Sequence, residues 1–272
     1  MKKMTVNADA NRFECAEKYA AYLATPEGRL RLDLTFANLQ EFLPQAKRPL
    51  HTLDLGCGTG VIAVRLARLG LRVTLLDSSL PMLDLAKRAA QEAGVAERIT
   101  LKHGDVAQLG NLFDAGSFDL VLCHNLLEYV DDPSAVLRSA ARTLRDRSSI
   151  ISVLVRSRAG EVLKAAIKDG DLAATEHNLT AECGHESLYG SRVRLFAVES
   201  LHCMLAAVSL MVTAERGVRV LSDYLPPPVS RADEYERIFE LERKLGRRSE
   251  FVAVARYLHC LARRTGVANL GV

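Results

Sequence analysis

The chain has 272 residues, 49% of them hydrophobic and 25% charged, which is enough for one large α/β domain with an added segment. Its formal net charge is only +3, so no global field favours nucleic acid as a partner. With no apolar run of membrane-spanning length and no signal-peptide pattern, we expect a cytoplasmic protein that does not contact a membrane.

The six cysteines are scattered without a C-x-x-C pair, as expected for reduced thiols. Cys183 with His185, and His259 with Cys260, have no second pair at zinc spacing. We therefore expect no metal site. The sequence does not predict the oligomeric state.

The first predicted elements are two amphipathic helices between about Arg12 and Phe42, with a break at Thr25-Pro26-Glu27. Threonine followed by proline is typical of a helix N-cap and its first helical position. Arg31 lies in the second helix, either as a solvated side chain or as one that reaches over a ligand pocket. We interpret residues 1–48 as an N-terminal helical cap.

A buried strand, a glycine-rich turn and a helix follow within about residues 50–69. Gly56, Gly58 and Gly60 let the backbone turn tightly and approach a ligand closely. The free N–H groups of the following helix point at the same place. A dinucleotide fold usually shows G-x-G-x-x-G, whereas this turn reads D-x-G-x-G-x-G from Asp54. The next strand ends in Asp77, a carboxylate placed to accept hydrogen bonds from both hydroxyls of a ribose.

Strands and helices then alternate along the chain. We expect strands at 71–76, 99–103, 118–123 and 149–155, with helices at 80–93 and 132–144. This alternation predicts a parallel sheet with helices on both faces and a ligand at the carboxyl ends of the strands. Asp105, Val106, His124 and Asn125 follow two of those strands, so they should meet in the same crevice. We interpret residues 49–155 as the ligand-binding core.

From 156 to 200 the pattern loosens and no clear strand is predicted, so we interpret this segment as a substrate lid insertion. A helix at 196–207, a strand at 209–213, a proline turn at 225–228, a helix at 233–245 and a strand at 255–263 complete the layout. Residues 201–272 would then complete the core. The expected sheet has seven strands, the last one antiparallel.

The D-x-G-x-G-x-G turn, with Asp77 ending the next strand, resembles motif I of the class I S-adenosylmethionine-dependent methyltransferases. The resemblance implies a Rossmann-like class I methyltransferase fold, an enzyme, and S-adenosylmethionine as cofactor. The residues that we expect to contact the cofactor are Arg31, Asp54, Gly56, Cys57, Gly58, Thr59, Gly60, Asp77, Ser78, Met82, Asp105, Val106 and His124.

Five wider segments resemble the bacterial tRNA 5-carboxymethoxyuridine methyltransferases, which esterify the carboxylate of a modified wobble uridine during tRNA processing. The segments are 17–19, 28–31, 122–130, 217–225 and 235–264. The resemblance implies the anticodon loop of tRNA as partner. It also implies that Arg31 pairs with the carboxylate of the cofactor's methionine, Asp77 binds the ribose, Asp105 and Val106 the adenine, and that His124 lies on the sulfonium side.

The acceptor chemistry remains open between several classes. A carboxylate, with a reference pKa of about 4, is ionised at neutral pH and needs positive charge rather than a base. A phenol or amine would instead require His124 to take a proton, and no other catalytic residue is predicted. Residues expected to contact the acceptor are Tyr22, Tyr189, Arg192, Arg194, Arg219 and Tyr224.

Two alternatives accompany the tRNA interpretation. One is a methyltransferase acting on a small-molecule carboxylate, phenol or amine. The other is a non-catalytic protein of methyltransferase fold that binds cofactor or RNA. Exocyclic N-methylation of adenine or cytosine is disfavoured, because the Asn/Asp-Pro-Pro-aromatic motif of such enzymes is replaced here by His124-Asn125-Leu126-Leu127.

Overall fold

The structure is a computed structural model that describes residues 8–186, 190–226, 229 and 232–265. Tyr189 and part of the predicted proline turn lie outside the described residues. No described helix is both long and apolar enough to cross a membrane.

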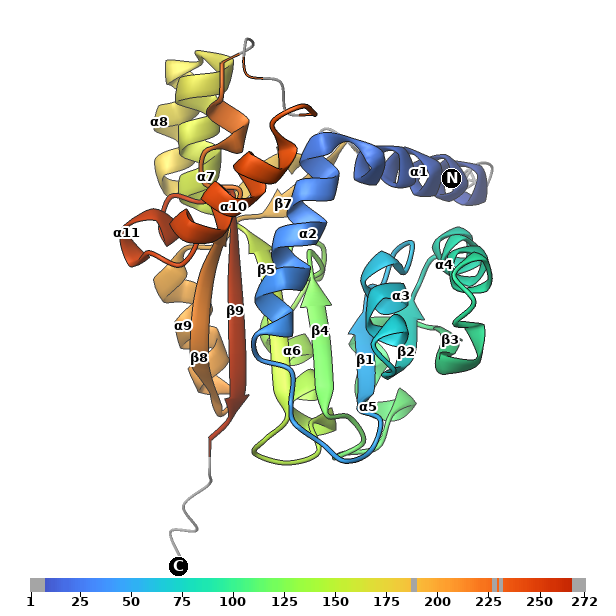
Figure 1. Cartoon of the computed structure of the whole chain (residues 1–272). Coiled ribbons are helices and arrows are strands. Elements are labelled where there is room, and N and C mark those ends of the chain that lie inside the picture. The colour runs from blue at the N-terminus through green and yellow to red at the C-terminus, as the bar shows by residue number, and fades with distance from the viewer. Residues whose placement is uncertain (1–7, 187–189, 227–228, 230–231, 266–272) are drawn as a thin grey trace, which may run out of the picture.

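A single seven-stranded sheet with the order β3-β2-β1-β4-β5-β9-β8 forms the centre of the molecule (Figure 1). Its parallel part contains β1 (His51–Leu55), β2 (Arg72–Asp77), β3 (Ile99–His103), β4 (Leu120–His124) and β5 (Ile150–Arg156). β9 (Tyr257–Arg264) runs antiparallel to both β5 and β8 (Leu210–Val218). The predicted Rossmann-like sheet is confirmed, including the antiparallel last strand.

Helices cover both faces of this sheet, as the alternating pattern predicts. On one face, α2 (Pro26–Gln40), α3 (Val61–Arg68) and α4 (Leu80–Glu92) bury an aliphatic cluster with β2 and β4. On the other, α5 (Leu109–Leu112), α6 (Pro133–Thr143) and α9 (Val198–Ala207) pack over β4, β5 and β9. α10 (Tyr235–Leu245) packs against α2, and α11 (Ser249–Val252) contacts β8.

The N-terminal helices begin and end where the capping pattern predicts. α1 (Ala8–Ala24) ends before Thr25, whose Oγ1 accepts a hydrogen bond from the N–H of Gly28 at 3.1 Å. Pro26 occupies the first turn of α2, where a missing N–H costs nothing. α1 lies over the carboxyl ends of the parallel strands and reaches toward α4, whereas α2 runs along the face of the sheet (Figure 1).

Segment 156–200 contains more regular structure than predicted. It forms α7 (Arg158–Leu163), a π-helical turn η3 (Lys164–Asp169), α8 (Leu172–Thr180) and a hairpin of β6 (Cys183–Glu186) and β7 (Ser191–Arg194). The prediction of no strand was wrong because each hairpin strand has four residues and buries only one of them. β8 likewise extends past the predicted end at 213, through the polar pair Glu215 and Arg216.

Candidate functional site

A cleft of about 1390 Å³ lies over the carboxyl ends of the parallel strands, beneath α1 and α2. Its walls include most of the predicted site residues: Tyr22, Arg31, Gly56, Gly58, Asp77, Ser78, Met82, Asp105, Val106, His124 and Arg219. Asp54, Cys57 and Thr59 instead line a small adjoining cavity that shares Arg31, Gly56 and His124 with the cleft. Gly60 lies behind the turn, where an added Cβ would meet that of Ala86 at 2.8 Å.

The glycine turn and the end of β2 hold each other in place. Asp77 accepts hydrogen bonds from the N–H groups of Gly58 at 2.9 Å and Ser79 at 2.8 Å. Gly58 has a φ of 54°, and a Cβ there would lie 3.2 Å from the ring of Tyr19. The carboxylate of Asp77 is therefore fixed at the cleft wall with acceptor capacity left for a ligand hydroxyl.

Two further aspartates lie at the ends of the parallel strands on either side of β2: Asp54 in β1, just before the glycine turn, and Asp105 after β3. Burial, followed by the charge of Asp77, raises the pKa of Asp54 to about 8, so Asp54 is protonated at neutral pH. A cationic ligand group beside it would favour the ionised form. Asp105 accepts a hydrogen bond from the N–H of Ala107 at 2.8 Å and caps the short helix η2 (Val106–Gln108). Asp105 thus stabilises a local turn and also lines the cleft.

Arg31 is a buried cation without an anionic partner among the described residues. Its guanidinium donates to the hydroxyl of Tyr19 at 3.0 Å and lies 5.1 Å from the ring centre of Tyr22 and 5.6 Å from that of Tyr257. Burial opposes its charge, but the surrounding tyrosines outweigh burial and raise its pKa. Because an unpaired buried charge is costly, this position suits the carboxylate of a ligand. The wall formed by Arg31, Asp77 and the glycine turn fits a ligand that carries a ribose and an amino acid.

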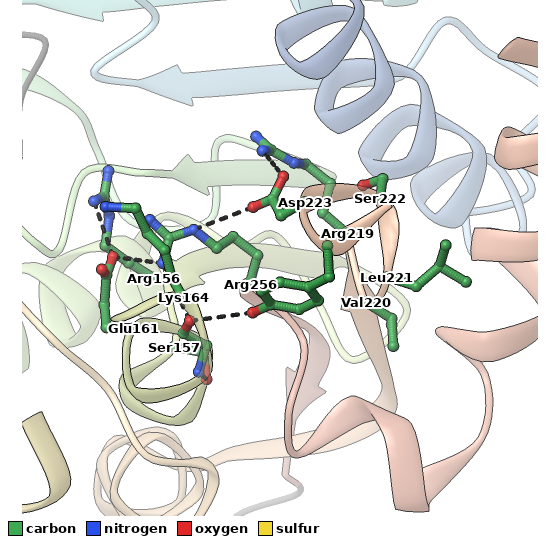
Figure 2. Close-up of polar contacts among 12 residues, drawn as sticks. Arg156, Ser157, Glu161, Lys164, Arg219, Val220, Leu221, Ser222, Asp223 and Arg256 are labelled. Carbon is green, nitrogen blue, oxygen red and sulfur yellow. Dashed lines mark hydrogen bonds and ion pairs between the residues drawn. The ribbon is translucent and has the colours of Figure 1, made fainter. Parts of the chain in front are cut away.

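A second group of arginines lines the opposite part of the cleft (Figure 2). Glu161 pairs with Arg156 at 3.0 Å and with Arg256 at 2.8 Å. Asp223 pairs with Arg219 and lies 3.5 Å from Arg256. Each carboxylate lies between two guanidinium groups, which fixes the arginines while leaving them at the cleft wall. We call Arg156, Arg219 and Arg256 the arginine cluster.

Arg219 is held in a conformation that non-glycine residues seldom adopt, with a φ of 60°. The following turn is fixed by Glu242 of α10, whose buried carboxylate accepts three backbone N–H bonds. The donors are Val220 at 2.6 Å, Leu221 at 3.1 Å and Ser222 at 2.7 Å. Such backbone strain at a ligand cleft is characteristic of functional sites.

Tyr257 lies among the guanidinium groups of Arg31 and the arginine cluster. Burial raises its pKa, but the four positive charges outweigh burial and lower it to about 8. The same charges act on any other anion in this part of the cleft. The guanidinium groups around Tyr257 therefore favour an anion at that position.

His124 ends β4 and lies between the two parts of the cleft. Burial, and then the charge of Arg31, lowers its pKa to about 3, so the imidazole is neutral at physiological pH. Its Nε2 lies 2.7 Å from Oγ of Ser152 in the neighbouring strand β5. The nitrogen that remains for the cleft is Nδ1.

Three of the residues expected to contact the acceptor do not line the cleft. Arg192 lies on β7, and Arg194 of the same strand donates to the carbonyl of Asp131 at 3.2 Å. The hydroxyl of Tyr224 donates to the carbonyl of Gly160 at 3.4 Å. These contacts stabilise the walls of the cleft from outside.

Several cleft residues were missed by the sequence interpretation, notably Arg156, Arg256, Tyr257, Lys164 and Lys168. Arg156 ends a parallel strand, just as Asp77 does, and that position was a usable signal. Arg256 and Tyr257 precede or begin an antiparallel strand, whose start lies at the same edge of the sheet. The two lysines lie in a π-helical turn, for which the sequence has no pattern.

One cluster of metal-ligating residue types lies elsewhere in the described structure. Nε2 of His202 lies 2.5 Å from Oε2 of Glu215, and Sγ of Cys260 lies within 4.8 Å of both ligand atoms. Cys260 packs on the face of the sheet covered by α9, and none of the three residues lines the cleft. The cluster thus contributes nothing to the chemistry of the cleft.

Comparisons with known proteins find similarity to methyltransferases. Residues 53–152 match a family described as a methyltransferase domain. The tRNA 5-carboxymethoxyuridine methyltransferase of Escherichia coli K12 is 27% identical, over 94% of this chain and 97% of its own length. A ubiquinone biosynthesis O-methyltransferase of Xanthomonas axonopodis is 34% identical, but over only 49% of this chain and 53% of its own length.

Solved structures show the same fold at lower identity. An S-adenosylmethionine-dependent methyltransferase from Thermotoga maritima has a TM-score of 0.63 and 15% identity, over 94% of this chain and 99% of that one. The 1,6-didemethyltoxoflavin-N1-methyltransferase of Burkholderia thailandensis, solved with S-adenosylhomocysteine, has a TM-score of 0.59 and 17% identity, over 97% and 92%.

Proposed function

The chain is a class I S-adenosylmethionine-dependent methyltransferase, and we propose that it esterifies the carboxylate of 5-carboxymethoxyuridine at the wobble position of tRNA. The observation that carries this proposal is the arginine cluster. It lines the cleft opposite the glycine turn, together with Tyr257. The chain's similarity to the Escherichia coli enzyme over almost the full length of both proteins supports the same acceptor.

The cofactor wall is assigned as follows. Arg31 binds the carboxylate of the methionine moiety, Asp77 the ribose hydroxyls, and Asp105 with Val106 the adenine. The glycine turn, with Asp54, Cys57 and Thr59, lies against the methionine end, while Ser78 and Met82 extend the wall beyond Asp77. When bound, the cofactor supplies an electrophilic methyl group on its sulfonium.

The acceptor side works by charge and position. A carboxylate is already ionised, so it needs no general base, and holding it in line with the methyl donor supplies much of the rate enhancement. The three guanidinium groups of the arginine cluster pair with the carboxylates of Glu161, Glu186 and Asp223, and the buried carboxyl of Glu128 lines the same cleft. Lys164 and Lys168 add further positive charge to the wall. Because the ion pairs hold the guanidinium groups at the cleft wall, these groups are positioned to donate hydrogen bonds to an ionised acceptor.

A small-molecule acceptor is the second candidate, favoured by the half-length similarity to a ubiquinone biosynthesis O-methyltransferase. A phenol acceptor would need a base, and a histidine with a pKa of about 3 is poorly matched to that task. A non-catalytic binding protein is disfavoured because the glycine turn, Asp77 and Asp105 are all intact at the cleft. We further propose that residues 156–186 and 190–200, with Lys164 and Lys168, form the wall nearest the tRNA.

The proposal is tested with tRNA whose wobble uridine carries the carboxymethoxy group but no methyl ester. The purified protein is incubated with this tRNA and S-adenosylmethionine, and the nucleosides are separated by mass spectrometry. Appearance of the methyl ester nucleoside is the expected result. If no product forms in a preparation whose cofactor binding has been measured by calorimetry, the proposal of a tRNA acceptor is contradicted and a small-molecule acceptor is favoured.

A further inference from the structure

A buried chain of polar side chains runs behind the cleft, across three neighbouring strands. Nε2 of His124 in β4 lies 2.7 Å from Oγ of Ser152 in β5, and the same Oγ lies 2.8 Å from Nε2 of His259 in β9. The two rings are 5.5 Å apart at an angle of 87°. Ser152 and His259 are fully buried. Leu154, which lies between the two histidines in strand register, packs against α2 on the same face.

The hydroxyl proton of Ser152 determines the direction in which these hydrogen bonds run. The hydroxyl of Ser152 has a single hydrogen, so it donates to one imidazole and accepts from the other. If both imidazoles donated to Oγ, the buried hydroxyl hydrogen would have no partner, which is costly. Burial lowers the pKa of both His124 and His259, so each ring is neutral and carries one proton. Two arrangements remain, and they differ in which histidine donates to Ser152.

Arg216 distinguishes between these two arrangements. It lies directly opposite His259 in the β8–β9 ladder, so the two side chains share one face of the sheet. Among the described residues, Nδ1 of His259 and Nε of Arg216 are both buried without a hydrogen-bond partner. Because Arg216 is positively charged and its Nε–H has no acceptor in the described structure, an unprotonated Nδ1 on His259 is more favourable beside it than a protonated one. The proton of His259 then lies on Nε2 and is donated to Ser152.

We propose that Ser152 and His259 are positioning residues that hold His124 in the tautomer protonated on Nδ1. His259 donates to Ser152, Ser152 donates to Nε2 of His124, and His124 presents an N–H donor to the cleft. Such a donor hydrogen-bonds an ionised acceptor but cannot take a proton from a neutral one. This role for His124 rests on the proposed carboxylate acceptor, whereas its tautomer does not depend on it.

The tautomer is measured without any substrate. Long-range ¹H–¹⁵N spectra of protein labelled on its histidines distinguish a protonated, pyrrole-type nitrogen from an unprotonated, pyridine-type nitrogen. The His124→Gln variant assigns the signals. We expect Nδ1 of His124 to be pyrrole-type and Nε2 pyridine-type. The reverse pattern, or an imidazolium, would overturn the proposal even if the enzyme methylates a carboxylate.

Two variants distinguish an effect on the tautomer of His124 from an effect on packing. Ser152→Ala removes the hydroxyl, so the Nδ1–H signature should give way to a mixture of tautomers. The kcat/KM for the acceptor should fall about 10-fold, with the dissociation constant of the cofactor unchanged. Leu261→Val alters packing beside Ser152 in the neighbouring strand β9 but leaves the hydrogen bonds. It should leave the tautomer unchanged and the activity within about threefold of the wild type. Equal effects of the two variants on the tautomer would contradict the positioning role.

Discussion

The two parts of the cleft are built in different ways. At the cofactor wall, Asp77 is held by the backbone of Gly58 and Ser79, all within a short stretch of the chain. On the acceptor side, Arg219 donates to the hydroxyl of Tyr22 at 3.0 Å, a contact between opposite ends of the chain. The glycine turn with Asp77 is thus a local motif, whereas the acceptor wall, formed by the arginine cluster and Tyr257, exists only once the antiparallel strands are in register.

Asp77 and Arg219 have no hydrogen-bond partner in common among the described residues, so a substitution at either one should impair one wall without the other. Asp77→Ala should weaken cofactor binding most strongly. Losing hydrogen bonds between a carboxylate and two ribose hydroxyls corresponds to roughly a 100-fold rise in the dissociation constant. Calorimetry measures this directly, and Asp84→Ala on the exposed side of α4 is the matched control. Equal affinities of the two variants would contradict the role of Asp77.

Arg219→Lys should do the opposite. Lysine keeps the charge but loses the planar fork that pairs with Asp223 and Tyr22, so kcat/KM for a carboxylate acceptor should fall roughly 10- to 100-fold. Cofactor affinity should stay constant. Arg237→Lys, at an 85% exposed side chain, is the control. A parallel loss of cofactor binding would show that the two walls are a single unit.

The acceptor wall should have a pH dependence of its own, set by Tyr257. As pH rises through about 8, Tyr257 becomes a phenolate and neutralises part of the positive charge, so the KM for the acceptor should increase several-fold. Tyr257→Phe should remove this increase, and a KM that does not change with pH in the wild type would contradict the assignment.

The stability of the fold should increase over the same pH range. Because the folded pKa lies below the unfolded value of about 10, stability is gained as pH rises from 8 to 10.

The smallest effect is expected for the lysines of η3. Lys168→Met in η3 should lower affinity for tRNA modestly and reduce the slope of log K against log salt by about one. Lys87→Met, on an exposed position of α4, should leave the slope unchanged. Binding assays at several salt concentrations measure both. Equal slopes would indicate that η3 does not contact phosphates.

The same difference explains how much of the molecule is predictable from the sequence. Strand and helix order follow from local periodicity, and Gly56, Gly58 and Asp77 follow from one motif that folds on itself. All of these were predicted, together with Arg31, which was expected from the resemblance.

The acceptor wall could not be predicted to the same extent. Whether Arg156 meets Tyr257 depends on the register between β5 and β9, which are about a hundred residues apart. Arg192 and Arg194 looked equally suitable as anion ligands, yet the hairpin places them outside the cleft. The Ser152–His259 contact likewise joins two strands whose individual sequences show no functional pattern.

The most direct test of the central claim is the chemical lability of the transferred methyl group. Purified protein is incubated with S-adenosylmethionine labelled on its methyl, and with the tRNA and small-molecule fractions of cells that lack the enzyme. Labelled product is then exposed to mild alkali. A carboxyl ester is hydrolysed, so we predict that the label is released as volatile methanol. Label that stays on the acceptor would mean an ether or an amine, and would contradict a carboxylate bound at the arginine cluster.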